Sequence, residues 1–498
     1  MRPLLLLEVL AVGTFGVLAV TQLWPTKSTV HAIDVSTLAV GPAEETWSGI
    51  FIGEHHVGYS VSRESPIASG GRLYEERSTF ALGSMGTTQQ VTTAGTAITD
   101  DQGLLVQFDF LLTSPVLMTA HGEVQPGVIH VELNQDGATS SLDVPITEPP
   151  ALSMTAANVV KGRTLHPGDV FELPYFNPIT VTPSTMRVTV QAPEVLPNGE
   201  VGYWLELDGG GLSTRRLVDE SGAVLREEAA LGMQTVRMTK AEAIKVDAGE
   251  APDLVALARV PLSGFIDPAR PYGPLTLEVS GIDAAKLPSD GDVQRVNGAR
   301  VTLTTPDPST WPVLPVRGTS DLEATPTVPV DHPEIVAKAR EVVGDAPDRA
   351  TAARRLSEFV HDYVQKVPTI GIPNGLEVLH TAQGDCNEHT ALYVSLARAA
   401  GIPARIAAGV VYSAQLGQAF YYHAWPEVRI GPDESWVPVD PTFGEFPAHA
   451  THLQLVTGDL DRQLEIMASM GKLRLAVAPN PEPEAGAAVP TPDTEPTR

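Results

Sequence analysis

The sequence predicts an α+β protein in which an antiparallel β-rich region precedes a smaller module of helices and strands. Three observations lead to this fold class. Short runs of alternating apolar and polar residues, with turn residues between them, recur from about residue 47 to residue 227, which is typical of antiparallel sheets. Two amphipathic helical patterns follow at 334–343 and 347–364. A third helix, at 387–400, is followed by further strand-like runs.

Composition and charge narrow the classes of function. The chain has 498 residues, of which 43% are apolar, and this is enough for about three domains with their own cores. Acidic residues outnumber basic residues by 60 to 33, which gives a net charge of −27. A phosphate backbone would be repelled, so we expect no nucleic-acid partner. The negative charge suits an exported protein that has to stay soluble.

Residues 1–32 predict either a signal peptide or an N-terminal membrane anchor. Arg2 precedes an apolar run whose uninterrupted core, 9–20, has the length of a signal-peptide h-region, whereas the longer stretch 3–24 could span a membrane. Val30-His31-Ala32 fits the small-x-Ala cleavage pattern. In both cases we expect the body of the chain to be exported to the periplasm or the cell envelope. With its single cysteine, the chain can form no intramolecular disulfide.

The region 33–304 predicts two β-rich domains, 33–165 and 166–304, separated within a proline-containing stretch. The expected strands cover 47–52, 57–63, 72–82, 87–98, 104–112, 116–124, 127–133, 141–144, 186–191, 201–207 and a hairpin at 217–227. Strands at this spacing favour antiparallel sheets over βαβ units. We expect this region to be a platform that holds the C-terminal module away from the membrane, or a surface that recognises a substrate or a partner.

Three further segments complete the expected organisation. The stretch 305–332 is rich in Pro and Thr, so it predicts a semi-rigid linker or a strap along a domain surface. Residues 333–477 form the C-terminal module, whose first two helices present apolar faces to the expected sheet. The tail, 478–498, has no aromatic residue and much Pro, Glu and Ala. We expect it to be disordered.

The only cysteine of the chain, Cys386, stands at the start of the third helix of this module. Gly384 and Asp385 interrupt the chain just before it, and Gly401 and Pro403 end the helix. At a helix N-terminus, unpaired backbone N–H groups and the positive end of the helix dipole favour a thiolate over a thiol. This is the setting that an attacking cysteine needs.

A base and an orienting carboxylate are available further along the chain. His423 begins the strand-like run 423–430 and Asp440 ends the run 436–440, so both could face the start of the helix. A thiolate attacks an acyl carbon, an imidazole exchanges the proton, and a carboxylate holds the imidazole in the right tautomer. The backbone N–H of Cys386 is the expected oxyanion donor, and Gln383 is a weaker candidate with its side chain.

Each of these residues also has a purely structural interpretation. Cys386 could be a small buried apolar residue, His423 a strand histidine, and Asp440 the first residue of an Asx-turn. Glu388 and His389 are expected to lie in a solvated first helical turn, where an acid suits the helix dipole.

Metal binding is a further alternative that the sequence disfavours. Cys386 and His389 have C-x-x-H spacing, and His423 could add a third ligand, but a second cysteine is absent from the sequence. For His449 and His452 a surface role is expected. The sequence also has no D-x-D-x-D-G calcium loop. We therefore expect no metal and no cofactor.

Four motifs in order resemble the bacterial transglutaminase-like superfamily. They are G-x-C at the helix start, L-x-R-x-x-G-I-P-A-R at 396–405, H-A-W-x-E-V at 423–428 and W-x-x-x-D-P-T at 436–442. The resemblance covers about residues 330–475. It implies a papain-like α+β fold with Cys386, His423 and Asp440 in the catalytic positions.

The resemblance implies an exported cysteine enzyme that forms a thioester acyl-enzyme from an amide or peptide substrate. Water would complete hydrolysis, as in a protease or amidase, whereas an amine would complete transamidation, and the motifs do not choose between them. The expected substrate is a protein, a peptide or a peptide-like polymer of the cell envelope. The alternative is a catalytically silent scaffold or binding protein of the envelope with the same fold. The presence of all three catalytic residue types favours the enzyme.

Overall fold

A computed structural model describes residue 33 and residues 38–478 of the chain. The described part has short gaps at 85–86, 114–116, 136–137, 197–198, 210–211, 247–250, 268–272, 291, 319, 326, 368, 370–372, 460–461 and 464. The expected signal peptide or anchor at 1–32 lies outside the described residues, as does the expected tail apart from Ala478, so both stay predictions. No helix in the described part of the chain is long and apolar enough to cross a membrane.

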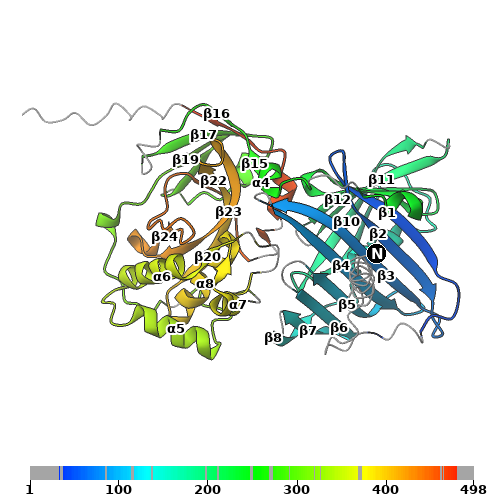
Figure 1. The fold of residues 1–498 in the computed structure, drawn as a ribbon, viewed down its shortest axis with the longest axis horizontal. Coiled ribbons are helices and arrows are strands. Elements are labelled where there is room, and N and C mark those ends of the chain that lie inside the picture. Colours follow the sequence, from blue (N-terminus) through cyan, green and yellow to red (C-terminus); the bar gives the residue numbers. More distant parts are fainter. Residues whose placement is uncertain are drawn as a thin grey trace, which may run out of the picture.

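The first half of the chain forms one antiparallel sheet of fourteen strands (Figure 1). Its first eight strands are β1 (Glu44–Ile52), β2 (His55–Pro66), β3 (Arg72–Ser84), β4 (Thr87–Thr99), β5 (Leu105–Thr113), β6 (Leu117–Gln125), β7 (Val128–Gln135) and β8 (Ala138–Pro145). The other six are β9 (Val170–Asn177), β10 (Thr182–Val195), β11 (Val201–Gly209), β12 (Leu212–Val218), β13 (Val224–Glu228) and β14 (Met233–Met238). The short helices α2 (Ser153–Ala156) and η2 (Ala157–Val160) lie between the two groups.

The sheet order is β8 to β1 followed directly by β14 back to β9. Within each group, successive strands are neighbours, and the two groups join where β1 pairs with β14, from Trp47 opposite Met238 to Ile52 opposite Met233. The expected boundary at 165/166 therefore does not divide two sheets, because strands on both sides of it belong to this one. Periodicity identifies strands but not the strands with which they pair.

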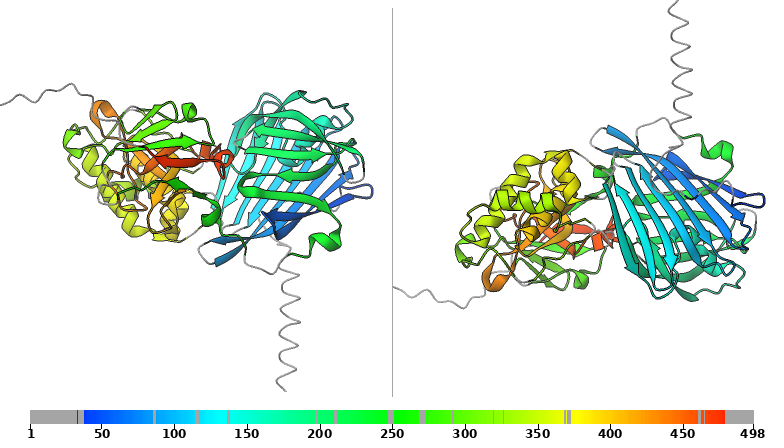
Figure 2. Two further views of the ribbon diagram at one scale, coloured as in Figure 1. Left: turned by 90° about the horizontal axis from the view of Figure 1, so that it is seen from above. Right: turned by 90° about the horizontal axis from the view of Figure 1, so that it is seen from below.

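The core of this sheet follows from the alternation of its strands. On β10, Met186, Val188 and Val190 are buried while the residues between them are more exposed, so the apolar side chains share one face. The sheet curls until its two groups face one another (Figure 2). Phe108 of β5 meets Phe176 of β9 with ring centroids 5.4 Å apart, which places the core between the two groups.

Residues 259–303 join the C-terminal half of the molecule. Their strands are β15 (Arg259–Val260), β16 (Leu262–Ser263), β17 (Leu275–Ser280), β18 (Gln294–Asn297) and β19 (Arg300–Leu303). Strands β16 to β19 share a sheet with β26 (Arg474–Val477), in the order β16-β26-β17-β19-β18. The segment expected to end the second β-rich domain thus completes the C-terminal module instead. Three short helices, α3 (Lys240–Ala243), α4 (Leu254–Leu257) and η4 (Ala284–Lys286), accompany this part of the chain.

The stretch 305–332 lies along the C-terminal module as a strap, one of the two forms expected for it. The buried side chain of Arg349 donates a hydrogen bond to the Pro315 carbonyl (3.0 Å), and Arg398 donates one to the Glu323 carbonyl (2.6 Å). Val328 and Val330 are buried in the core of the module. Apart from η5 (Pro308–Thr310), the described residues of the strap contain no helix.

The C-terminal module packs helices against a second antiparallel sheet. The helices are α5 (Pro333–Val343), α6 (Arg349–Tyr363), α7 (Gly375–Thr381) and α8 (Cys386–Ala399). The sheet has the order β15-β23-β22-β25, with β24 beside β23, and its strands are β22 (Ala404–Ser413), β23 (Ala419–Arg429), β24 (Trp436–Pro438) and β25 (His452–Thr457). The shorter elements are β20 (Gln365–Lys366), β21 (Gln383–Gly384), η6 (Pro432–Glu434) and η7 (Glu465–Ser469). Broadly, the chain is an α+β protein.

Helix α8 holds the centre of this module because most of its surface is apolar. Leu392, Tyr393, Val394 and Leu396 are all fully buried, so the middle turns of the helix are packed on every side. The sheet lies on one side of α8, and α5, α6 and α7 lie on the other (Figure 1). The expected helices at 334–343, 347–364 and 387–400 are present, whereas α7 and β25 were not expected from the sequence.

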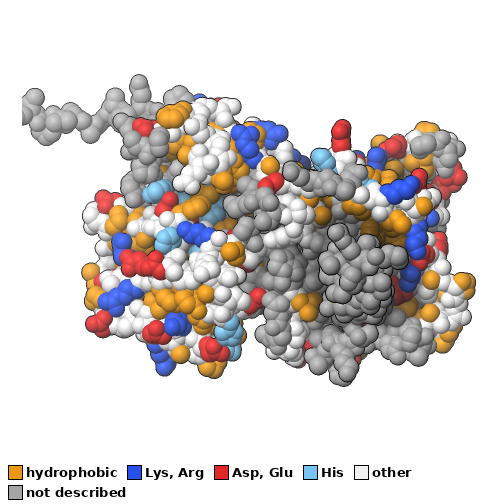
Figure 3. Space-filling view, in the orientation of Figure 1, with side chains coloured by type: hydrophobic (Ala, Val, Ile, Leu, Met, Phe, Trp, Pro, Cys, Tyr) orange, Lys and Arg blue, Asp and Glu red, His pale blue; other side chains and the backbone are white. Residues whose placement is uncertain are grey.

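Charged side chains are mixed on the molecular surface. On the face shown in Figure 3, acidic and basic side chains are scattered over both halves of the molecule, and no single basic patch dominates that face. The opposite face is not visible in this view.

Candidate active site

The start of α8 is built by the sequence Gly384-Asp385-Cys386-Asn387-Glu388. Asp385 is the N-cap, and its side chain accepts a hydrogen bond from the Asn387 N–H (2.9 Å). Glu388 accepts one from the Asp385 N–H (2.8 Å), which completes a capping box. Gly384 has a φ of 158°, and a Cβ there would lie 2.2 Å from the Glu388 Cβ, so the approach to the helix requires glycine.

Cys386 occupies the first position of the helix and is partly exposed. The first four N–H groups of a helix have no intrahelical partner. Here the cap accepts from Asn387 and Glu388, and the Asp385 carbonyl accepts from His389 (3.1 Å). The helix and its cap therefore leave the Cys386 N–H without an acceptor of their own, as expected for an oxyanion donor.

The resting state of the Cys386 thiol differs from the expectation. Burial raises the pKa of this thiol well above its ordinary value, and the nearby Asp385 carboxylate raises it further. A hydrogen bond from the Ala424 backbone N–H to the sulfur acts in the opposite direction but does not compensate. The helix dipole alone therefore does not produce a thiolate, because acidic groups surround the same helix end.

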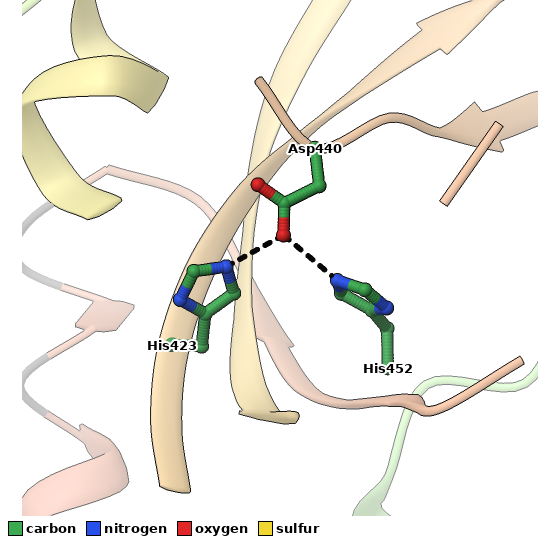
Figure 4. A group of neighbouring side chains, drawn as sticks. All are labelled: His423, Asp440 and His452. Carbon is green, nitrogen blue, oxygen red and sulfur yellow. Dashed lines mark hydrogen bonds and ion pairs between the residues drawn. The ribbon is translucent and has the colours of Figure 1, made fainter. Parts of the chain in front are cut away.

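His423 and Asp440 meet in a buried hydrogen bond. His423 lies on β23 next to Ala424, whose N–H reaches the sulfur of Cys386. Its Nε2–H donates to Asp440 Oδ2 at 2.7 Å (Figure 4). This bond assigns the proton of a neutral imidazole to Nε2 and leaves Nδ1 as the basic nitrogen. The structure thus brings together the histidine and the aspartate expected from the sequence, and the residue after this histidine, Ala424, contacts the Cys386 sulfur through its N–H.

Asp440 is held by its own loop as well as by histidine. Its other oxygen, Oδ1, accepts hydrogen bonds from the backbone N–H groups of Thr442 (2.8 Å) and Phe443 (3.1 Å). Oδ1 therefore makes the Asx-turn, while Oδ2 of the same carboxylate binds His423. Burial alone would raise the pKa of Asp440, but the imidazoles of His423 and His452 hold that pKa well below its ordinary value. Asp440 is a carboxylate at neutral pH.

A second histidine, His452, contacts the same carboxylate oxygen. Its Nε2 lies 3.0 Å from Asp440 Oδ2 (Figure 4). Its Nδ1 lies 3.1 Å from the His449 carbonyl oxygen. His452 begins β25 and is only 5% exposed, so the expected surface role is wrong for this residue. His449 is half-buried and pairs with Glu445 at 2.8 Å. The apolar run that follows His452 in the sequence is the one signal that could have indicated its burial.

Phe443 is another residue of the site that sequence reasoning missed. Its ring stacks on the His423 imidazole, with centroids 4.9 Å apart and an interplanar angle of 17°. The Trp425 ring is also nearly parallel to that imidazole, at 6.2 Å. Phe443 is 48% exposed. It therefore offers an apolar surface to any molecule that approaches His423.

The remaining expected residues occupy different environments. Gln383 is exposed on β21, three residues before Cys386, so its oxyanion role stays a prediction. Glu388 and His389 are buried, not solvated as expected, because the first turn of α8 is enclosed by the module. Glu388 accepts a hydrogen bond from Thr369 (2.6 Å), and His389 Nδ1 donates to the Asp385 carbonyl (2.6 Å).

The donor atoms of His423, Asp440 and His452 lie within 4.8 Å of one another, which raises the question of a metal ion. Two ligands on one metal, each about 2.0–2.1 Å from it, are separated by roughly 2.9 Å or more. The 2.7 Å between His423 Nε2 and Asp440 Oδ2 is shorter than that and has the length of a charge-assisted hydrogen bond. The arrangement therefore fits protons between these atoms better than it fits a metal.

Comparison with known proteins finds one family model that matches part of the C-terminal module. Residues 336–441 match the family model described as the transglutaminase-like superfamily, which confirms the resemblance seen in the four motifs. No curated protein matches the sequence significantly.

Solved structures show weaker likenesses. The chain is similar to a β-barrel-like protein of a domain of unknown function from Brucella abortus, with 10% identity over 40% of this chain and 96% of that chain and a TM-score of 0.29. It is also similar to a candidate cysteine protease from Cytophaga hutchinsonii, with 14% identity over 44% of this chain and 82% of that chain and a TM-score of 0.27. TM-scores this low support no statement about activity.

Proposed function

We propose that the protein is a cysteine acyltransferase or hydrolase with a papain-like catalytic domain, because residues 336–441 match the family model of the transglutaminase-like superfamily. Cys386 is the nucleophile, His423 the general base and acid, and Asp440 the residue that orients His423. The observation that carries the proposal is the buried bond between His423 Nε2 and Asp440 Oδ2, 2.7 Å long, beside a strand whose Ala424 N–H reaches the Cys386 sulfur.

The acylation step begins from a protonated thiol, since burial and Asp385 raise the pKa of Cys386. As the sulfur attacks the amide carbon, His423 Nδ1 takes the thiol proton, and Asp440 stabilises the imidazolium that forms. The carbonyl oxygen becomes an oxyanion, for which the Cys386 N–H is the donor and Gln383 a further candidate. His423 then gives its proton to the leaving amine, the C–N bond breaks, and a thioester remains on Cys386.

Deacylation uses the same residues in reverse. His423 takes a proton from water or from a primary amine, and the resulting nucleophile attacks the thioester carbon. The C–S bond breaks and the thiol regains its proton from His423, which releases an acid or a new amide. We propose a protein, a peptide or a peptide-like polymer of the cell envelope as the acyl donor, in line with the expected export. The exposed ring of Phe443 favours an apolar group next to the scissile amide.

Trapping the acyl-enzyme tests this proposal. The full-length protein is incubated with a mixture of peptide amides and with cell-envelope peptides, and intact mass measurement follows any adduct. We expect a hydroxylamine-sensitive adduct that maps to Cys386, turnover of the donor, and neither in Cys386→Ala. Added primary amine separates the two outcomes, because only a transamidase incorporates it into product.

A matched variant distinguishes chemistry from general reactivity. His423→Ala keeps the thiol, so adduct formation at neutral pH should fall by at least about 10²-fold. Adducts that form equally fast in the wild type and in His423→Ala would contradict the proposed role of His423. Absence of both adduct and turnover in the folded wild type with all these donors would favour the silent scaffold instead.

A further inference from the structure

We propose that His452 is a positively charged positioning residue, which holds the Asp440 carboxylate in the orientation that fixes the His423 ring. The site would then consist of four side chains, Cys386, His423, Asp440 and His452. This inference rests on the proposed function, because it concerns the same reaction. It goes beyond the three residues that the sequence motifs carry.

The hydrogen bonds of His452 indicate its charge. Nδ1 lies 3.1 Å from the carbonyl oxygen of His449, which is only an acceptor, so Nδ1 carries a proton. Nε2 lies 3.0 Å from Asp440 Oδ2, and a carboxylate is also only an acceptor. Both ring nitrogens therefore donate, and a histidine that donates from both nitrogens is an imidazolium.

The groups around His452 favour its positively charged form. Burial by itself would lower the pKa of His452, but Asp440, through its hydrogen bond and its charge, raises it above the ordinary value, and Glu445 raises it further. The Trp425 ring meets the imidazole edge-on at 5.0 Å. Among the described residues, the other histidine ring next to His452 is that of His423, and the two ring centroids are 5.9 Å apart.

The position of this charge gives it a role at His423. Oδ2 of Asp440 accepts from both imidazoles, so the carboxylate is fixed from two sides and its charge is shared between them (Figure 4). The two rings lie 5.9 Å apart. The charge of His452 therefore acts on the carboxylate that orients His423, while His423 takes the Cys386 proton. Oδ1 of Asp440 accepts hydrogen bonds from backbone N–H groups, so both oxygens of the carboxylate are held in place.

The substitution His452→Gln separates charge from hydrogen bonding, because the glutamine amide can still donate to Asp440 but carries no charge. Since Cys386 is the sole thiol, the rate of its alkylation by iodoacetamide against pH reports on the site without any substrate. Removing a positive charge near the site raises the proton affinity of the Cys386 thiol. We expect the alkylation midpoint to move up by about one to two pH units. The limbs of the kcat/KM profile should move in the same direction.

The control is His380→Gln, which removes an exposed histidine of α7 that pairs with Glu334. Its midpoint should equal that of the wild type. An unchanged midpoint in a folded His452→Gln protein would overturn the proposal, because a merely structural histidine is replaced by an amide without electrostatic consequence.

A second measurement does not depend on the variant. In the wild-type protein labelled with ¹⁵N-histidine, the ring of His452, assigned through the backbone resonances of the same residue, should show two protonated nitrogens at pH 7. One unprotonated ring nitrogen at that pH would overturn the proposal. If the wild type turns over no acyl donor while His452 is doubly protonated and the alkylation midpoint shifts, the proposed function fails and the charge of His452 stands.

Discussion

At Asp440, four hydrogen bonds converge on one buried carboxylate. Backbone N–H groups of its own loop hold Oδ1, and the two imidazoles hold Oδ2. A carboxylate bound in this way can neither rotate nor be replaced by water, so the plane of the His423 ring is fixed with it. The orientation of the base therefore depends on the loop 440–445 as much as on β23.

The substitution Asp440→Asn tests this orientation. An amide NH₂ placed toward His423 favours the wrong imidazole tautomer, so we expect kcat to fall by about 10³–10⁴-fold while some turnover remains. Cys386→Ala should leave none. The exposed Asp433, in the turn before β24, supplies the control Asp433→Asn, which should retain full activity. A loss of less than about tenfold in Asp440→Asn would contradict the orienting role.

The substitution Asp385→Asn tests why the thiol is protonated at rest. Asparagine keeps the side-chain oxygen that caps α8 but removes the negative charge beside Cys386. We expect the pKa of the Cys386 thiol to fall, so that the alkylation midpoint moves to lower pH. The exposed Asp345 gives the control Asp345→Asn, with an unchanged midpoint. A midpoint that rises in Asp385→Asn would show that the cap, not the charge, controls the thiol.

The same variant has an expected effect on stability. Burial, followed by the charge of Glu388, raises the pKa of Asp385 well above its ordinary value in the folded state. Folding therefore favours the protonated form of Asp385 relative to the unfolded chain. The stability that this group contributes is present at low pH and is lost as the pH rises through the folded-state pKa. We expect Asp385→Asn to have a higher Tm than the wild type at pH 7 and a difference that shrinks below pH 4.

Cys386 and Asp440 could be predicted from the sequence because each lies next to a recognisable local motif. Cys386 follows the N-cap of α8, and Asp440 begins a turn. His452 and Phe443 could not be found in the same way. Each reaches His423 only because the chain after Asp440 folds back over β23, and a contact of that kind leaves no periodic signal in the sequence.

At the scale of elements, α8 and the strap 305–332 show which features a sequence determines and which it leaves open. The boundaries of α8 follow from Asp385 at its start and Gly401 after its end, so this helix was predictable. The strap has no periodicity, and its course is determined by buried partners on the module. One of these partners is Arg349, which has no local signature because its acceptors, the carbonyls of Pro315 and Arg429, lie elsewhere in the chain.

The substitution Arg349→Leu tests how the strap is attached. The guanidinium is 1% exposed and donates to two backbone carbonyls and to Glu434, so its loss leaves buried acceptors without donors. We expect the free energy of unfolding to fall by about 2–4 kcal/mol, measured by urea denaturation. Arg354→Leu, an exposed position on the same helix, should cost under about 1 kcal/mol. Equal losses in both variants would exclude a special role for Arg349.

At the scale of the whole molecule, the division of the chain into parts differs from the expected one. Residues 259–303 were assigned to the second β-rich domain together with the rest of 166–304, but β15 pairs with β23 and β17 pairs with β26. Their apolar side chains share a core with the C-terminal module, where Leu277 and Val301 pack in the cluster that contains Leu453 and Leu475. Strand patterns give no information about which sheet a strand joins.

This division predicts which fragments fold. Residues 258–478 contain every described strand of the two smaller sheets and should unfold cooperatively as a soluble fragment. Residues 305–478, which contain the expected linker 305–332 and the expected module 333–477, lack β15 to β19 and expose the apolar cluster around Leu453. We expect the shorter fragment to aggregate or to lack a cooperative thermal transition, as followed by circular dichroism. A shorter fragment as stable as the longer one would show that the expected boundary at 305 was adequate.

The pairing of β1 with β14 has a consequence for how the protein acquires its structure. Each group of strands, β1 to β8 and β9 to β14, can assemble from neighbouring hairpins as it leaves the ribosome or enters a new compartment. Trp47 and Met238, by contrast, are distant in the chain, and closing so long a loop is slow. The junction therefore forms last. Until it does, the unpaired edges of β1 and β14 are exposed. At this stage of folding the chain is most prone to aggregate with other copies of itself.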